Sequence, residues 1–128
     1  MCFTVHKDHK KIKIAEKNIT CYKIFKKSPK KYLISPYRRF KYEKGELYYE
    51  DSVTKPCLDI FGIGNIHVGL HSYSHRREHR SWDMRKYVLV KCIIPKDSKY
   101  YYNPTTNEYV SDHLKIGTDK DIIKKLII

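Results

Sequence analysis

The stretch YVLVKCIIP (87–95) is the strongest fold signal in this chain. Its apolar run is almost continuous and ends at Pro95, which is typical of a strand at the centre of a sheet. Upstream, alternating and β-branched apolar residues run from Ile12 to Phe25 and also predict strand structure. We therefore expect a sheet built around residues 87–95.

Weaker strand signals flank this centre. Residues 32–50 alternate aromatic with charged side chains, so Phe40 and Tyr42 would share one face of a strand. The sequence EKGE (43–46) predicts a hairpin turn in which Gly45 takes a positive φ, with a return strand directly after it. Two further short strands are predicted, over residues 66–73 and 109–116.

Two segments have helical signals. Residues 74–87 contain neither Gly nor Pro, and Ser74 can cap a surface helix there. Residues 118–128 predict a short C-terminal helix, because Thr118 and Asp121 have capping-box-like spacing. The apolar face of this second helix packs on the sheet or mediates self-association, and it comprises Ile122, Ile123, Leu126 and Ile127.

Together these elements predict an α+β fold. We expect a mostly antiparallel sheet of about six or seven strands with one internal and one C-terminal helix. The length of 128 residues corresponds to a single domain, 1–128. Within it we expect a loose basic arm over 1–11, a sheet core over 12–117 and the terminal helix over 118–128.

The composition is strongly basic. Lys and Arg total 27 against 14 acidic residues, which gives a net charge of +13. Such a charge favours an anionic partner, although lysine-rich surfaces also simply keep proteins soluble. The apolar runs are too short for a transmembrane helix, and the N-terminal residues lack the apolar core of a signal peptide. The sequence thus predicts a cytoplasmic protein without a membrane partner.

The cysteines and histidines of this sequence are its candidate metal ligands. The four cysteines form no CxxC pair, and Cys21 and Cys92 lie among apolar residues, so buried core thiols are expected. His75 and His79 would share one helix face and could hold a divalent metal, with His71 or a distant acidic residue as the third ligand. The alternative is a solvated cationic helix face, and HRREH lacks the glutamate of a zinc protease. We expect neither a metal nor a cofactor.

Basic and aromatic residues interleave at 32–49, the tyrosines at 100–102 form a second aromatic patch, and arginines cluster on the predicted helix at 76–85. Arg side chains there can bind phosphate, Tyr rings can stack on a base, and a His can hydrogen-bond a ligand. Core packing and a solvated helix face are the competing interpretations of the same residues. The predicted ligand-binding residues are Tyr37, Arg38, Arg39, Tyr42, His71, Arg76 and Arg80. Nucleotide-binding glycine loops and nucleophile motifs are missing from the sequence, which favours a binding protein over an enzyme.

Several motifs between residues 12 and 116 resemble a group of small uncharacterised proteins of bacteriophages and gut bacteria. The matching segments include SPYRRFKYEKGELYYE, VGLHSYS and YVLVKCIIPKDSKYYYN. That group has Phe and Gly where this chain has Leu70 and Asp97. A weaker similarity, through Gly69, Ser72, Ser74, Pro95, Lys96 and Glu108, is to ADP-ribosyltransferase folds, in which Arg38 would be the early arginine. The paired glutamate motif of those enzymes is absent here.

These observations lead to one functional expectation and two alternatives. The first is a phage-type, non-enzymatic protein that captures an anionic nucleotide-derived ligand, which would suit counter-defence by sequestering an immune signal. One alternative is an inhibitor that binds a host defence protein or nucleic acid through its basic face. The other is an ADP-ribosyltransferase-like enzyme that uses Glu108.

Overall fold

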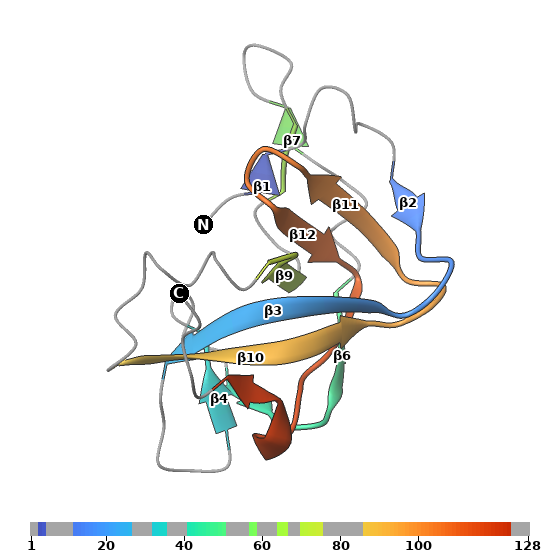
Figure 1. Cartoon of the computed structure of the whole chain (residues 1–128). Helices are drawn as coiled ribbons and strands as arrows, with labels where there is room; N and C mark the ends of the chain where they lie inside the picture. The colour runs from blue at the N-terminus through green and yellow to red at the C-terminus, as the bar shows by residue number, and fades with distance from the viewer. Residues whose placement is uncertain are drawn as a thin grey trace.

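A long two-stranded ribbon forms the centre of the molecule. Strands β3 (Ile19–Lys26) and β10 (Tyr87–Ile94) pair antiparallel along their whole length and lie side by side in Figure 1. The prediction that residues 87–95 form a central strand is confirmed. The computed structural model describes residues 3–4, 12–26, 32–35, 41–50, 57–58, 64–66, 70–75 and 86–123.

The outer edge of β10 is shared by two strands. β13 (His113–Lys115) pairs at Ile93, and β14 (Ile122–Ile123) pairs at Leu89 and Val90. β13 in turn pairs with β6 (Leu47–Tyr49), which ends this side of the sheet among the described strands.

The outer edge of β3 is also divided. β9 (Leu70–Tyr73) pairs with it at Tyr22, and β4 (Tyr32–Ile34) pairs with it at Lys26. From β9 the sheet continues through β12 (Glu108–Ser111) and β11 (Lys99–Asn103) to β2 (Lys13–Ile14). β4 pairs on its other side with β5 (Lys41–Glu43). A separate small sheet contains β1 (Phe3–Thr4), β8 (Gly64–Ile66) and β7 (Cys57–Leu58).

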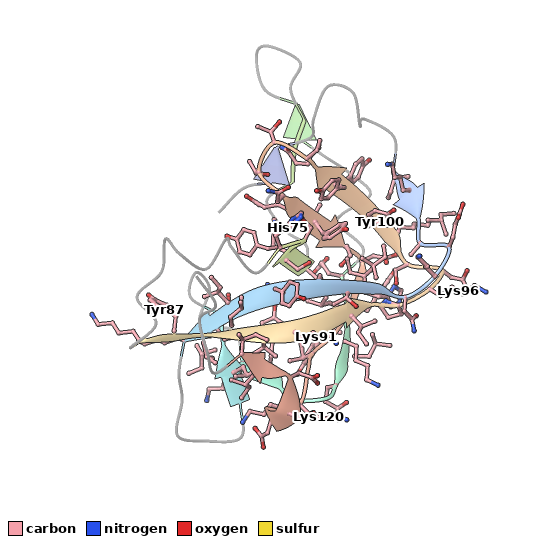
Figure 2. The ribbon with its side chains drawn as sticks, viewed as in Figure 1. His75, Tyr87, Lys91, Lys96, Tyr100 and Lys120 are labelled. Atoms are coloured by element: carbon pink, nitrogen blue, oxygen red, sulfur yellow. The ribbon has the colours of Figure 1, made fainter. Side chains whose placement is uncertain are left out.

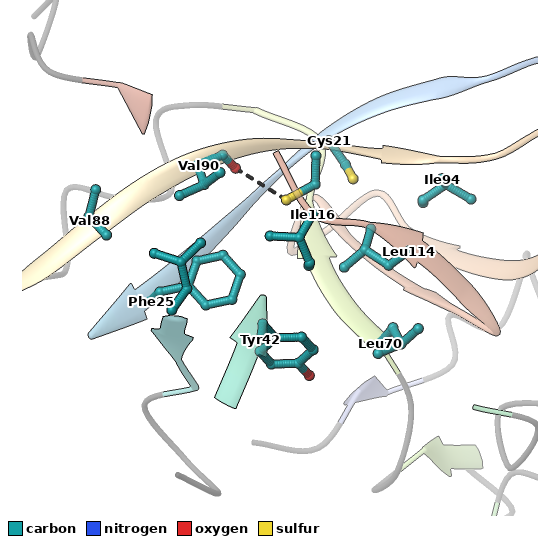
Figure 3. Close-up of a cluster of buried hydrophobic side chains, with 11 residues drawn as sticks. Cys21, Phe25, Tyr42, Leu70, Val88, Val90, Ile94, Leu114 and Ile116 are labelled. Carbon is teal, nitrogen blue, oxygen red and sulfur yellow. Dashed lines mark hydrogen bonds between the residues drawn. The ribbon is translucent and has the colours of Figure 1, made fainter. Parts of the chain in front are cut away.

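The core lies against one side of the ribbon, which we call its inner face. Side chains alternate along a strand, so every second residue of β3 and β10 points inward. Phe25, Val90 and Ile94 on this face are almost fully buried. Figure 3 shows the cluster, whose members are Cys21, Phe25, Leu33, Tyr42, Leu70, Val88, Val90, Cys92, Ile94, Leu114 and Ile116.

The predicted α+β class is wrong. The described residues form an 11-stranded sheet and a 3-stranded sheet, every pairing among them is antiparallel, and they contain no α-helix. The expectation of six or seven strands is also wrong, because several short strands pair along the outer edges of β3 and β10. Within the described ranges, no helix is long and apolar enough to cross a membrane.

The C-terminal helix predicted from residue 118 is replaced by a single 3-10 turn, Asp119–Asp121, followed by β14. The capping interaction itself is present, because the Asp121 carboxylate accepts a hydrogen bond from the Thr118 N–H at 2.9 Å. Pairing of β14 satisfies backbone N–H and C=O groups of β10 that would otherwise lack partners at that edge. Residues 124–128 lie outside the described part of the chain.

The predicted internal helix at 74–87 falls mainly on residues 76–85, which lie outside the described residues. Its two described ends are not helical, since Ser74 and His75 form a bend and Tyr87 begins β10. In the predicted basic arm, Phe3–Thr4 pairs with β8, and the rest of residues 1–11 is not described.

The turn at Gly45 is present with φ of +80°, as predicted, but it does not close a hairpin. β5 before it pairs with β4, and β6 after it pairs with β13. The reason is visible in the backbone hydrogen bonds: Gly45 N donates to Ile116 O at 3.0 Å, and Ile116 N donates to Glu46 O at 2.9 Å. The turn is therefore attached to the end of β13, and its two strands diverge.

Candidate functional site

A lysine lies among the core residues of the ribbon. Lys23 shares the inner face of β3 with Cys21 and Phe25, and it is directly opposite Val90 of β10. Its neighbours are buried and apolar, whereas its own side chain is half-buried. A lysine seldom occupies such a position without a partner for its charge.

The ammonium group of Lys23 contacts two parts of the protein. Its Nζ donates a hydrogen bond to the backbone oxygen of His71 at 2.6 Å. It also lies 5.9 Å from the ring centroid of Phe25 and 5.7 Å from that of Tyr42, within cation–π range. Among the described residues, no carboxylate forms an ion pair with Lys23. An ammonium has three N–H donors, so the carbonyl of His71 does not use its full capacity.

Burial changes the chemistry of this amine. Removal from water lowers the pKa of Lys23 from 10.5 to about 8, and the nearby Cys92 and Cys21 sulfurs offset this only in part. The group is therefore mostly protonated at pH 7 and mostly neutral at pH 9. Its charge at neutral pH is stabilised by one carbonyl and two aromatic rings.

The two thiols beside Lys23 are poor nucleophiles. Cys21 and Cys92 face each other across β3 and β10, and both are free and buried. Burial raises the pKa of Cys21 to about 12, despite the opposing effect of the Ser72 hydroxyl, and raises that of Cys92 to about 11. Because the thiolate is the reactive form, a raised pKa makes both cysteines unreactive at neutral pH. Both are buried core thiols, as predicted. The side chains of Cys2 and Cys57 are outside the described residues.

Two of the predicted ligand-binding residues meet at Lys23. Tyr42 is 8% exposed, and its ring packs edge-to-face on Phe25 and Tyr48 at centroid distances of 5.5 and 4.8 Å. His71, in β9, is half-buried and supplies the carbonyl that Lys23 contacts. The structure thus places the Tyr42 ring and the His71 carbonyl next to the same amine. The other predicted site residues lie outside the described part of the chain: Tyr37, Arg38, Arg39, Arg76 and Arg80.

The second aromatic patch anticipated at residues 100–102 divides between the two sides of β11. Tyr100 and Tyr102 are half-buried and contact the ring of Tyr109 on β12, at 5.9 and 4.8 Å between centroids. Tyr101 points the other way and is buried. Tyr102 also donates a hydrogen bond to Asn107 Oδ1 at 3.2 Å, which ties this patch to the β11–β12 turn.

The metal and transferase hypotheses depend on His75, His79 and Glu108. Within the described ranges, no group of three or more His, Cys, Asp or Glu side chains could hold a metal ion, and His79 is not described. The Nδ1 atom of His75 lies 2.6 Å from Ser74 Oγ. Glu108, the residue of the transferase alternative, is buried in β12 opposite Tyr73.

Comparison of the chain with protein families, curated proteins and solved structures finds no match to any of them. The resemblance to bacteriophage proteins and the counter-defence role that it implies stay predictions, as does the similarity to ADP-ribosyltransferases.

Lys23 is the residue that sequence reasoning missed. In the segment ITCYKIF (19–25), the alternation of Cys21, Lys23 and Phe25 puts the lysine in phase with two core residues. That signal was obscured because Tyr22 and Ile24 are also apolar, so both faces of the strand appear hydrophobic.

Proposed function

We propose that this protein binds a small phosphate-bearing anion at the Lys23 ammonium, between Tyr42 and His71. The observation that carries the proposal is a largely buried cation for which no described carboxylate provides a counter-charge. Buried charges are normally paired, because transfer of an unpaired ion from water is costly. A bound anion would supply the missing pair.

The electrostatics of the chain support an anionic ligand. The net charge of +13 raises the concentration of small anions near the surface, and this effect weakens with added salt. Two N–H donors of Lys23 remain for phosphate oxygens while the third contacts the carbonyl of His71. The low polarity around the amine would strengthen that contact relative to one in open water.

The surrounding side chains have distinct roles in this proposal. The Tyr42 and Phe25 rings limit the approach of water to the ammonium and stabilise its charge. His71 contributes its backbone carbonyl, while both of its ring nitrogens are shielded from solvent. In this proposal the site binds its ligand without chemical change, and the neighbouring thiols stay protonated at neutral pH.

Isothermal titration with ADP and with inorganic pyrophosphate at pH 7 tests this proposal. We expect wild type to bind at least one of the two probes, and Lys23→Met to lose that binding while it stays folded. Lys13→Met is the matched control, because Lys13 is an exposed lysine on β2, which lies at an edge of the sheet and does not pair with β3. Equal affinity in wild type and Lys23→Met, or binding of neither probe by wild type, would overturn the proposal.

The pH provides a second test of the same site. Because the Lys23 amine loses its proton near pH 8, affinity should fall about tenfold between pH 7 and pH 9. A ligand held only by the always-charged arginines would show no such loss. A flat affinity profile across this range would therefore place the binding site away from Lys23.

A further inference from the structure

The side of the ribbon opposite the core carries a different set of residues. Because Val90, Leu114 and Tyr48 point to the core, their strand neighbours point outward. Cross-strand register brings these outward residues together, since Lys91 lies opposite Tyr22, Ile93 opposite Lys115, and Lys115 opposite Leu47. We call this surface the outer face; its members are Tyr22, Leu47, Tyr49, Lys91, Ile93, His113 and Lys115.

The outer face is open to solvent. Tyr49 and Leu47 on β6 are 64% and 54% exposed, and Lys91 and Lys115 are exposed as well. Figure 2 shows Lys91 on β10, between Tyr87 at one end of the strand and Lys96 beyond the other. Towards Tyr87 the same side is covered, because Ile24 and Leu89 are buried there. The open surface therefore spans one half of the ribbon together with β13 and β6.

An aromatic pair on this surface is held in place from below. The rings of Tyr49 and His113 lie 4.7 Å apart between centroids. His113 Nδ1 is 2.8 Å from the buried Asp112 carboxylate, which also accepts a hydrogen bond from Lys99 N at 2.9 Å. The contact with Asp112 fixes the His113 ring, and Tyr49 packs on that ring. The pair therefore loses little conformational freedom when a ligand stacks on it, which favours binding.

The charge on this side has one sign. The outer face has two lysines, Lys91 and Lys115, and none of the outward-pointing residues of β3, β10, β13 and β6 is acidic. Cations beside exposed aromatic rings fit the backbone and the unpaired bases of a single strand. Bases in a duplex are stacked on each other and offer no such ring face. The geometry points to the outer face as a binding surface for single-stranded nucleic acid.

This proposal is independent of the small-anion site. Lys23 and Lys91 lie on opposite sides of the same ribbon, so a strand on the outer face would not reach the Lys23 amine. In the arrangement we propose, Lys91 and Lys115 contact phosphates while the exposed face of Tyr49 stacks on a base. Its sequence preference would be weak, because stacking tolerates every base.

Fluorescence anisotropy with labelled 15-nucleotide oligo-dT and oligo-U tests the surface. We expect the double variant Lys91→Ala/Lys115→Ala to bind at least tenfold more weakly than wild type. The slope of log affinity against log salt should become shallower by about 0.7 for each lysine removed. Tyr49→Ala should weaken binding about tenfold, and Tyr49→Phe should restore it, because stacking contributes an effect of that size.

Matched variants separate the two proposed sites. Lys13→Ala, on β2 at the far end of the sheet, should leave oligonucleotide affinity within twofold of wild type. Lys23→Met should also leave it unchanged, while it abolishes binding of ADP or pyrophosphate. The outer-face proposal is overturned if wild type does not bind either oligonucleotide, or if Lys13→Ala weakens binding as much as the double variant does.

Discussion

Two lysines on neighbouring strands of the ribbon show how strand alternation divides this molecule. Lys23 of β3 points to the core with Cys21 and Phe25, and its amine contacts a carbonyl and two rings. Lys91 of β10 points to solvent, opposite Tyr22. The two residues are chemically identical, and their positions on the ribbon differ by one step of register.

The difference shows that position, more than residue type, determines the chemistry of each lysine. On the inner face, loss of water lowers the pKa of the amine and makes its charge expensive to maintain. On the outer face, water solvates the ammonium and leaves it available to a polyanion. A single-residue slip of either strand would turn its lysine to the other face, so the interactions that fix register also maintain both sites.

The largest expected effect concerns the residue that holds β13 and β14 against β10. A Cβ added at Gly117 would overlap the Lys91 carbonyl oxygen and would lie 2.6 Å from Asp121 Cβ and 3.0 Å from Val90 Cγ1. Because backbone atoms cannot move aside cheaply, Gly117→Ala should lower the free energy of unfolding by about 3 kcal/mol, measured by urea denaturation.

Gly45→Ala is the control for this substitution. Its added Cβ would make only an ordinary contact, 3.5 Å from Thr118 Cγ2, and its cost of about 1 kcal/mol would come from the positive φ. Equal losses in the two variants would show that Gly117 does not hold the strands together by close packing.

The next effect tests the comparison of the two lysines directly. Lys23→Met should raise the free energy of unfolding at pH 7 by about 2 kcal/mol, because an apolar side chain replaces a poorly compensated buried charge. Lys91→Met should change it by less than about 0.5 kcal/mol, since that lysine is exposed. Chemical denaturation of both variants without added anions gives these values. Strong destabilisation by Lys23→Met would mean that the contact with His71 outweighs the burial cost.

The pH dependence of this advantage should have a defined sign. The native amine loses its proton near pH 8 and the unfolded amine near 10.5, so in this window the unfolded state binds more protons. The contribution of Lys23 to stability therefore improves as the pH rises. The advantage of Lys23→Met over wild type should shrink by about 1 kcal/mol between pH 7 and pH 9.

Comparing the two proteins at each pH removes an opposing effect of the cysteines. Cys21 and Cys92 have native pKa values raised to about 12 and about 11, so they destabilise the fold as the pH rises above 9. Both proteins contain these thiols, and the effect cancels in the difference. A constant difference from pH 7 to pH 9 would contradict the proposed burial of the Lys23 amine.

The smallest effect is expected at the turn that follows β10. Asp97 has φ of +72°, in the left-handed region that favours glycine, and its N–H donates to Ala15 O at 2.8 Å. Asp97→Gly should keep this bond and stabilise the protein by about 0.5 kcal/mol, seen as a rise in Tm. Asn107→Gly, at φ of +55°, should bring no gain, because Asn107 Oδ1 accepts the Tyr102 hydroxyl.

Parts of this structure could be predicted from sequence and parts could not. The central strand at 87–95 and the positive φ of Gly45 were accessible, because each follows from local preferences. The inward position of Lys23 was not, since Ile24 and Phe25 are adjacent and both faces of β3 appear apolar. The phase of that strand is set by its pairing with β10, which involves residues far along the chain.

The prediction of a C-terminal helix was wrong for a related reason. The capping pattern of Thr118 and Asp121 was correct, but it does not reveal how long the following helix is. Ile122 and Ile123 enter the sheet because β10 has unpaired backbone groups at Leu89 and Val90. Within the candidate site, Tyr42 and His71 were predicted from the sequence, but Lys23, whose amine contacts both, was not.

The pairing of β3 with β10 also constrains how the molecule is made. β3 leaves the ribosome before its partner β10, which follows only after the intervening chain has been translated at about 5–20 residues per second. During those seconds the apolar surfaces of Ile24 and Phe25 have no partner strand. Folding dominated by such distant contacts is slow, so we expect chaperones to bind nascent β3 before β10 emerges.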